Sequence, residues 1–332
     1  IFVFDGNQRP RMKRGHRVIT HELDYQKHSK TMIKLFGYHD YSIVFTCSST
    51  KQTIQAPGEA EAELVDMLKQ GVIDTILSKD SDVFPLGADS VLKIIEPKIK
   101  GSRKCWEELE VYVYDAKTLQ THLGYSQAGL ILISLLLHND FTSSVNGIGR
   151  QTAHGLAQSG FGDVLLNSYQ KYSMIPEQLS QAFKKLNEDM AHEIQYNVRG
   201  CMGSCSPTRA KILRDSAFPT PGDLEVLNTF LRPVMSSSLA LQPVPTALRL
   251  PTLPDVVGIT AFCSEHFAWS AKLTLEHFHA SLWPGVLIRM LFSVCTNSFT
   301  MFLYPHTLVR NILSITRINQ NFWSPVSRAN TR

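Results

Sequence analysis

The chain has 332 residues, of which 43% are hydrophobic. That length and apolar fraction are typical of a globular protein with one large or two moderate domains, and they exclude a disordered tail. The formal net charge is only +4 at pH 7, so nucleic-acid binding cannot rest on overall basicity and requires local clusters of positive charge. One such cluster contains Arg9, Arg11, Lys13, Arg14 and Arg17.

Six cysteines without a paired CxxC spacing indicate reduced thiols in a cytosolic or nuclear protein. The opening residues do not resemble a signal peptide, and the start on Ile1 looks like a truncation. The segment Val286–Tyr304 has nearly the length of a membrane span. Arg289, Asn297 and several hydroxyl residues would make its insertion costly, so we expect no membrane partner.

The first element is a short apolar strand that ends at Asp5-Gly6. The run Ile1–Phe4 favours a strand buried on both faces in a parallel sheet, with Asp5 at its carboxyl end, where such sheets bind ligands. Residues 7–34 are basic and polar and become helical around His28–Phe36; they form either a solvated loop or a phosphate-contacting segment. Residues 40–52 are either a real strand and loop or an artefact of the gene model.

A β-α-β pattern with acids at one edge follows. Pro57 and Gly58 precede a helix predicted over Glu59–Gln70 that stops at Gly71, and its apolar residues recur at helical spacing. Val72–Leu77 is then a β-branched, apolar strand, and Lys79-Asp80-Ser81-Asp82 lies just past its end.

The spacing of the acids indicates half of a metal site. Glu59 and Glu61 can face one site only at the turn that enters the helix, because residues two apart lie on opposite sides of a regular helix. Asp80 and Asp82 are expected in an extended segment, where residues two apart point the same way. Carboxylates crowded on one side repel one another unless a cation lies between them. The structural alternative, solvated helix acids and a charged turn, suits Glu63 well.

Two more segments complete the sequence pattern. Leu92–Val113 predicts further strands around a basic loop, and Leu130–Leu137 predicts a core helix. Seven residues after Asp140, Gly147-Ile148-Gly149 opens a helix over Arg150–Ser159, where backbone N–H groups can hold a phosphate. An ordinary corner between two helices is the alternative.

Beyond residue 167 the chain is predicted to be helical and polar through Glu193. Residues 233–254 are rich in Pro and Ser and indicate a linker, and Ala261–Leu291 predicts a closing helical segment with Trp269, Phe278 and Trp283 in its core. Residues 292–332 show no clear periodicity. We therefore expect a nuclease-type core over 1–125, a helical region over 126–230, and a linker with a C-terminal extension over 231–332.

Four ordered motifs, IFVFDG, APGEAEAEL, LSKDSDVFPLGA and LLHNDFTSSVNGIG, resemble the flap endonuclease and xeroderma-pigmentosum-G superfamily of structure-specific nucleases. The stretch FCSEHFAWS…LWPG resembles the Holliday junction resolvase branch, which includes the GEN/Yen-type enzymes of fungi. The resemblance implies an α/β, PIN-like (5′-3′ exonuclease-like) parallel sheet flanked by helices, followed by a helical helix–two-turn–helix DNA-binding region.

Carried over residue by residue, the resemblance implies a metal and catalytic site that binds two Mg²⁺ ions, or Mn²⁺, and hydrolyses DNA phosphodiesters at flaps and Holliday junctions. It implies these ligands: Asp5, Glu59, Glu61, Asp80, Asp82 and Asp140. Glu63 is left out, and a further aspartate of the family would precede Ile1.

The resemblance also implies DNA contacts from the glycine turn, often with a bound K⁺: Gly147, Ile148, Gly149 and Arg150. The cluster of positive charge near the start of the chain adds candidate DNA contacts at Arg11, Lys13 and Arg14. The helix after this turn usually has a lysine near its start, and Arg150 could serve the same phosphate. The expected partner is branched double-stranded DNA, bound as a homodimer on a four-way junction, and the expected location is the nucleus.

Two other functions remain open. Without the aspartate that precedes Ile1, the chain could be a catalytically impaired protein that binds DNA structures. A PIN-like nuclease directed at RNA is a third reading, which the glycine turn disfavours because it suits duplex backbone.

Overall fold

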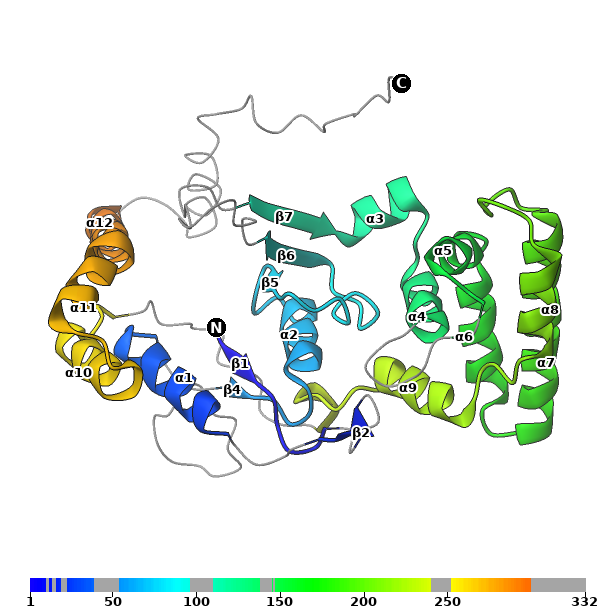
Figure 1. Ribbon diagram of the computed structural model, residues 1–332, viewed down its shortest axis with the longest axis horizontal. Helices are drawn as coiled ribbons and strands as arrows, with labels where there is room; N and C mark the ends of the chain where they lie inside the picture. Colours follow the sequence, from blue (N-terminus) through cyan, green and yellow to red (C-terminus); the bar gives the residue numbers. More distant parts are fainter. Residues whose placement is uncertain are drawn as a thin grey trace, which may run out of the picture. The chain divides into compact units, whose positions relative to one another are not determined.

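The computed structural model describes residues 1–9, 12–13, 16–18, 23–38, 54–95, 110–137, 145, 147–239 and 252–299. The chain forms two compact units (Figure 1). The first comprises Ile1–Ile33 and Tyr38–Leu250, and the second comprises Lys34–Gly37 and Pro251–Arg332. The boundaries predicted near residues 125 and 230 stay predictions.

The first strand pairs with the segment that leads into the acid-rich helix. β1 (Val3–Phe4) is parallel to β4 (Ile54–Gln55), and the pairing continues where Gly6 N donates to Gly58 O at 2.7 Å. The strand is shorter than predicted and is not buried on both faces, because Phe2 is 45% exposed and β1 is only half-buried. Among the described strands, β1 has β4 as its one neighbour.

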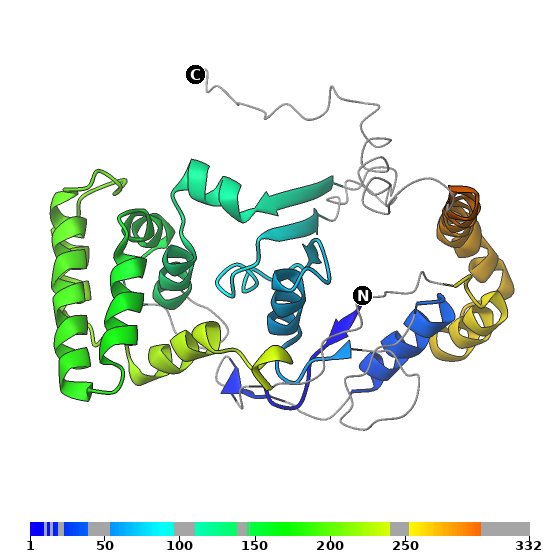
Figure 2. The same ribbon diagram turned by 180° about the vertical axis from the view of Figure 1, so that it is seen from behind.

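The acid-rich helix is the centre of the first unit. α2 (Ala60–Lys69) lies within the predicted bounds, and Gly71 follows it with φ +71°. Ala62, Val65 and Met67 are buried, and α2 packs against β1 and β5 (Ile76–Leu77) (Figures 1 and 2). The strand predicted over Val72–Leu77 is therefore confined to its last two residues.

A small mixed sheet follows. β5 is parallel to β6 (Ser90–Ile95), and β6 is antiparallel to β7 (Glu110–Asp115), in the order β5-β6-β7. The predicted strands of this region are confirmed, whereas the basic loop between them lies outside the described residues. α3 (Ala116–Leu123) begins directly after β7, capped by the Asp115 side chain, which accepts a hydrogen bond from Thr118 N.

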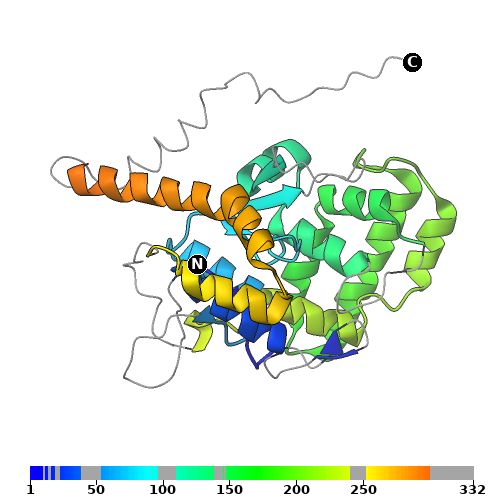
Figure 3. The ribbon, with the colours of Figure 1, turned by 60° about the vertical axis from the view of Figure 1, so that its left-hand side comes forward.

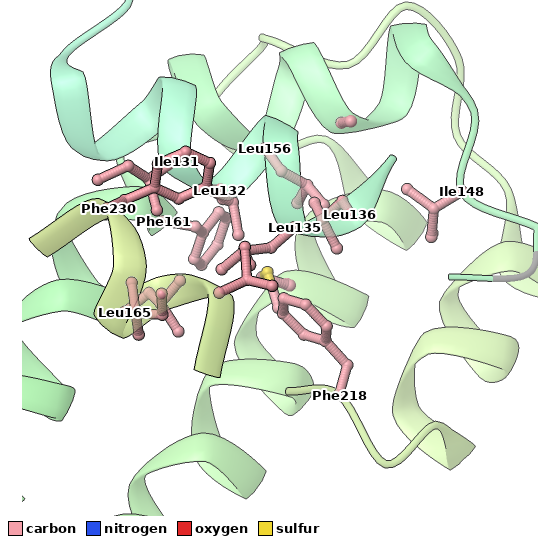
Figure 4. Close-up of a cluster of buried hydrophobic side chains, with 14 of the residues drawn as sticks. Ile131, Leu132, Leu135, Leu136, Ile148, Leu156, Phe161, Leu165, Phe218 and Phe230 are labelled. Carbon is pink, nitrogen blue, oxygen red and sulfur yellow. The ribbon is translucent and has the colours of Figure 1, made fainter. Parts of the chain in front are cut away.

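Helices make up most of the rest of the first unit. α4 (Gln127–Leu136) confirms the predicted core helix, and four of its side chains, Ile131, Leu132, Leu135 and Leu136, are fully buried. It packs against α5 (Arg150–Gln158), α6 (Phe161–Tyr172) and α9 (Pro221–Leu231). Figure 4 shows this apolar cluster, to which α6 adds Phe161 and Leu165.

Further helices and strands belong to the first unit. α7 (Pro176–Tyr196) and α8 (Pro207–Asp215) pack side by side, as Figures 1 and 2 show. β2 (Met12–Lys13) and β3 (His16–Arg17) pair in antiparallel fashion. The helix predicted around residues 28–36 is observed as α1 (Asp24–Leu35), whose last residues belong to the second unit.

The second unit is helical among its described residues. Figure 3 shows α10 (Val256–Phe267), α11 (Ala271–His277), the π-helix η2 (Phe278–Leu282) and α12 (Trp283–Phe299) in succession. Phe278 is buried as predicted, whereas Trp269 and Trp283 are only half-buried. α12 continues past residue 291, into a stretch that shows no clear periodicity in the sequence. None of the described helices is long and apolar enough to cross a membrane.

Candidate metal centre and DNA-backbone contacts

Asp5 is fixed at the start of α2. Its Oδ1 accepts a hydrogen bond from Ala60 N at 3.0 Å, so that Asp5 satisfies one of the free N–H groups of the first turn. Its Oδ2 is 2.9 Å from Nη1 of Arg9. A Cβ at Gly6 would lie 1.8 Å from Ala56 O, so only glycine permits this approach of the two backbones.

Glu59 and Glu61 occupy the entrance of the same helix, as their spacing predicted. Glu59 is the N-cap residue, with extended backbone angles of φ −81° and ψ 143°, and Glu61 is in the first helical turn. Burial is the main cause that raises the pKa of Glu61, and repulsion from Asp5, Glu59 and Asp80 adds to it. Four carboxylates from three segments therefore interact electrostatically at this point.

Asp80 and Asp82 lie in a turn rather than in the expected extended segment. Asp80 N donates a hydrogen bond to Ser78 Oγ at 3.1 Å, and Asp82 N donates to Asp80 Oδ1 at 3.1 Å. These local hydrogen bonds between side chains and backbone bend the chain, so the argument that both side chains point the same way does not apply. The turn is tied to α2, because Lys69 Nζ donates to Leu86 O at 3.0 Å.

Five of the six predicted ligands lie among the residues that the structure describes. Asp140 lies outside the described residues. Within the described ranges, no three His, Cys, Asp or Glu side chains form a group arranged to hold a metal ion. The oxygen-only donor set fits a hard cation such as Mg²⁺ or Mn²⁺, and the crowding around Glu61 is the kind of repulsion that a cation relieves.

A pocket of about 350 Å³ adjoins these acids. It is lined by Glu59 and Asp82 and also by Arg9, a residue that the sequence marked only as part of a basic cluster. The C-terminal end of α9 and the residues after it supply further lining residues: Asn228, Thr229, Phe230, Arg232, Pro233 and Val234. Polar and charged groups of both signs thus surround one hollow beside the candidate metal centre.

Glu63 is buried, which contradicts the prediction that it is solvated. It is 1% exposed, and its Oε2 accepts a hydrogen bond from Ser236 N at 2.9 Å. One turn further along α2, Asp66 accepts hydrogen bonds from Ser237 N at 3.2 Å and from Ser237 Oγ at 2.8 Å. The two acids bind the segment after α9. Their partners lie more than 170 residues away, so local spacing could not reveal this role.

The predicted glycine turn precedes a helix, as expected. Gly147 has φ +77°, Ile148 is buried, and Gly149 is the N-cap residue of α5, followed by the exposed Arg150. Arg11 and Arg14 lie outside the described residues, and Lys13 is placed in β2 without a described side chain.

Comparisons with known proteins point to one family. Residues 51–140 match the XPG I-region. The chain is 34% identical over 118 residues to flap endonuclease GEN-like 1 of Arabidopsis thaliana, covering 35% of this chain and 18% of that protein. It is 31% identical over 100 residues to flap endonuclease GEN of Drosophila melanogaster, covering 30% and 14% of the two chains. The chain thus spans less than a fifth of the length of these relatives.

Solved structures give the same fold. A eukaryotic junction-resolving enzyme GEN-1 binding with sodium superposes with a TM-score of 0.58 at 26% identity, covering 87% of this chain and 61% of that one. The Holliday junction-resolving enzyme GEN1 in complex with product DNA, Mg²⁺ and Mn²⁺ ions gives a TM-score of 0.52 at 25% identity, covering 87% and 59%. The PIN-like α/β fold is confirmed. Residues 51–140 of the chain thus match the XPG I-region, and the chain is similar to flap endonucleases and junction-resolving enzymes.

Proposed function

We propose that the protein is a metal-dependent, structure-specific endonuclease that hydrolyses phosphodiesters in branched DNA during repair and recombination. The observation that carries this proposal is the convergence of Asp5, Glu59 and Asp80 on the buried Glu61 at the start of α2. Burial is the main cause that raises the pKa of Glu61, and repulsion from the other three carboxylates adds to it. Its relatives are named flap endonucleases and junction-resolving enzymes, which supports the same reaction.

The candidate ligands are Asp5, Glu59, Glu61, Asp80, Asp82 and Asp140. Two divalent cations held there would activate a water and stabilise the leaving oxygen. The protein's own contribution is to fix the carboxylates: the Ala60 N–H and Arg9 orient Asp5, and the turn after β5 orients Asp80. Mg²⁺ is the proposed ion and Mn²⁺ its substitute, and both accompany DNA in the related GEN1 structure.

The duplex would be bound through its backbone. The first turn of α5 offers N–H groups that can hold a phosphate without reading a base, so DNA shape would decide the substrate. The proposal also includes K⁺ at the glycine turn and DNA contacts from Arg11, Lys13 and Arg14. It further includes a homodimer on a four-way junction and a nuclear location. Fluorescence microscopy of the tagged protein tests the location, and light scattering of the junction complex tests the dimer.

Cleavage of end-labelled flap and four-way-junction DNA in Mg²⁺ tests the reaction. The substitutions Glu61→Gln and Asp80→Asn should each reduce the cleavage rate at least a hundredfold, because each removes one charge from the site without changing its size. The matched control is Glu188→Gln, an exposed residue on α7. If the Asp80→Asn and Glu188→Gln variants cleave DNA at the same rate, the metal-site proposal fails.

A catalytically impaired protein that binds DNA structures is the second candidate. It is favoured by the fact that the described residues bring together no ready-made metal-binding group, although the glycine turn and α5 are formed. Binding of branched DNA without cleavage in Mg²⁺ or Mn²⁺ would support this candidate. Equal cleavage of single-stranded RNA would instead indicate an RNA-directed enzyme.

A further inference from the structure

α8 packs directly on the glycine turn, although about sixty residues separate them in the sequence. A Cβ at Gly147 would lie 2.9 Å from Cδ1 of Ile212, so the turn and α8 touch at this glycine. Ile212 is 38% exposed, which shows that the contact lies at the surface. Side chains of α8 beside Ile212 are therefore next to the turn that is proposed to hold a DNA phosphate.

Arg209 is the residue of α8 that reaches the first turn of α5. It lies one helical turn before Ile212, on the same side of α8. Its Nη1 is 3.4 Å from Oγ1 of Thr152, a buried residue of that first turn. The guanidinium is thus held beside the N–H groups at the start of α5, where Arg150 also lies.

Arg209 is the cation of α8 that lies one helical turn from Ile212, on the side that meets the glycine turn. The helix also carries Lys211, Arg214 and Asp215, and Arg214 is exposed on the opposite flank. Among the residues that the structure describes, the ion pairs involve none of these three cations. A phosphate at the start of α5 would meet a planar cation already oriented by Thr152, and arginine is well suited to bind a phosphate through two hydrogen bonds.

We infer that Arg209 is a second phosphate-binding residue of the glycine turn, so that α5 and α8 together hold one backbone phosphate of duplex DNA. This inference rests on the proposed DNA-binding function and adds a residue from a helix outside the sequence motifs. A phosphate contact contributes the same affinity for every sequence and makes binding depend on salt, because counterions are released.

The test is the salt dependence of duplex binding. Arg209→Gln removes the charge and keeps an amide that can donate to Thr152, and Arg214→Gln is the matched control on the opposite flank of α8. Fluorescence anisotropy with a labelled 20-bp duplex, in Ca²⁺ from 50 to 300 mM KCl, gives Kd and the slope of log K against log salt. We expect Arg209→Gln to bind about tenfold more weakly and to lose about 0.9 of the slope, and Arg214→Gln to match the wild type.

The outcomes separate the inference from the proposed function. A wild-type Kd and slope for Arg209→Gln, or an equal loss in Arg214→Gln, overturns the role of Arg209. We expect both variants to melt within 2 °C of the wild type. That result assigns the weaker DNA binding to the interface rather than to misfolding. Should the wild-type chain bind duplex but cleave no branched DNA in Mg²⁺, the nuclease proposal fails while Arg209 is still tested.

Discussion

Glu63 shows how one buried carboxylate can support a neighbouring site without belonging to it. It lies on α2 two residues after Glu61, but its side chain is directed to the Ser236 N–H rather than to the acids around Asp5. Together with Asp66 it holds residues 236–237 against the helix. The segment just before these serines lines the pocket beside Glu59, so the two acids help to shape that pocket.

Removing the acceptor of this hydrogen bond should destabilise the protein. Glu63→Ala leaves the Ser236 N–H buried without a partner, which costs about 1–3 kcal/mol of unfolding free energy. Glu188→Ala, an exposed position, should stay within about 0.5 kcal/mol of the wild type. Urea unfolding followed by circular dichroism measures both, and equal values would contradict the role given to Glu63.

The pH dependence of Glu63 has a definite sign. Burial is the main cause that raises the pKa of Glu63 above its ordinary value of 4.5, and the hydrogen bonds from Ser236 oppose this shift. The folded protein therefore binds this proton more tightly than the unfolded chain. The resulting stability is present below pH 4.5 and is lost as pH rises through the folded pKa.

Glu63→Gln isolates this effect, because glutamine keeps an acceptor for the Ser236 N–H and does not titrate. Relative to the wild type, the variant should gain unfolding free energy as pH rises from 4.5 through the folded pKa. Urea unfolding of both proteins between pH 4.5 and pH 8 gives this difference. A difference that does not change with pH would show that Glu63 keeps its ordinary pKa.

At the scale of elements, the contact between α6 and α4 depends on the absence of a side chain. A Cβ at Gly162 would lie 2.3 Å from Ala128 O and 2.6 Å from Gly129 N, both in the first turn of α4. α4 is the most buried helix of the core in Figure 4 and precedes the glycine turn. The close approach at Gly162 therefore helps to set where the proposed DNA contact lies.

Gly162→Ala should separate these helices. The added methyl group has only backbone atoms to displace, and such overpacking typically costs about 1–3 kcal/mol. Gly222→Ala in α9 is the matched control, because its Cβ would meet Thr220 Oγ1 only at 3.7 Å. That variant should be neutral or more stable by up to about 1 kcal/mol. Equal melting temperatures for the two variants would contradict the close packing.

The sequence predicted well those helices whose ends are marked by strong local signals. α2 and α5 agree with the predicted bounds within about a residue, because Pro57-Gly58, Gly71 and Gly147-Ile148-Gly149 mark their ends. The turn at Asp80 was missed, although Ser and Asp side chains commonly bond to nearby backbone N–H groups and favour turns. The apolar run before Asp80 favours a strand, and therefore an extended segment after it.

Long-range contacts explain most of what the sequence could not predict about the site. The approach of Asp5 to Ala60 spans 55 residues, and that of Arg209 to Thr152 spans 57. Periodicity reports which face of an element is apolar, but not which element covers it. The family resemblance supplied the grouping of Asp5 with Glu59 and Glu61, whereas Arg9 and Arg209 lie outside the motifs and required the structure.

At the scale of the whole molecule, the crowded carboxylates link stability to divalent cations. Burial of Glu61, and in addition repulsion from Asp5, Glu59 and Asp80, raise the pKa of Glu61, so holding these carboxylates together costs free energy. A ligand that binds only the folded chain stabilises it by an amount set by its concentration relative to Kd, about 2.7 kcal/mol at a hundredfold excess. The first unit contains all the described acids of the site, so its unfolding should report cation binding.

Mn²⁺ should therefore raise the melting temperature by about 5–10 °C at a hundredfold excess over its Kd, and EDTA should reverse the rise. The rise should be larger at pH 8 than at pH 5.5, because a proton on Glu61 competes with the metal and the raised pKa extends that competition upward. Differential scanning calorimetry measures both. Asp80→Asn should lose most of the effect, and Glu188→Gln should retain it. A melting temperature that Mn²⁺ leaves unchanged at either pH would mean that the acids at the start of α2 repel one another without holding a cation.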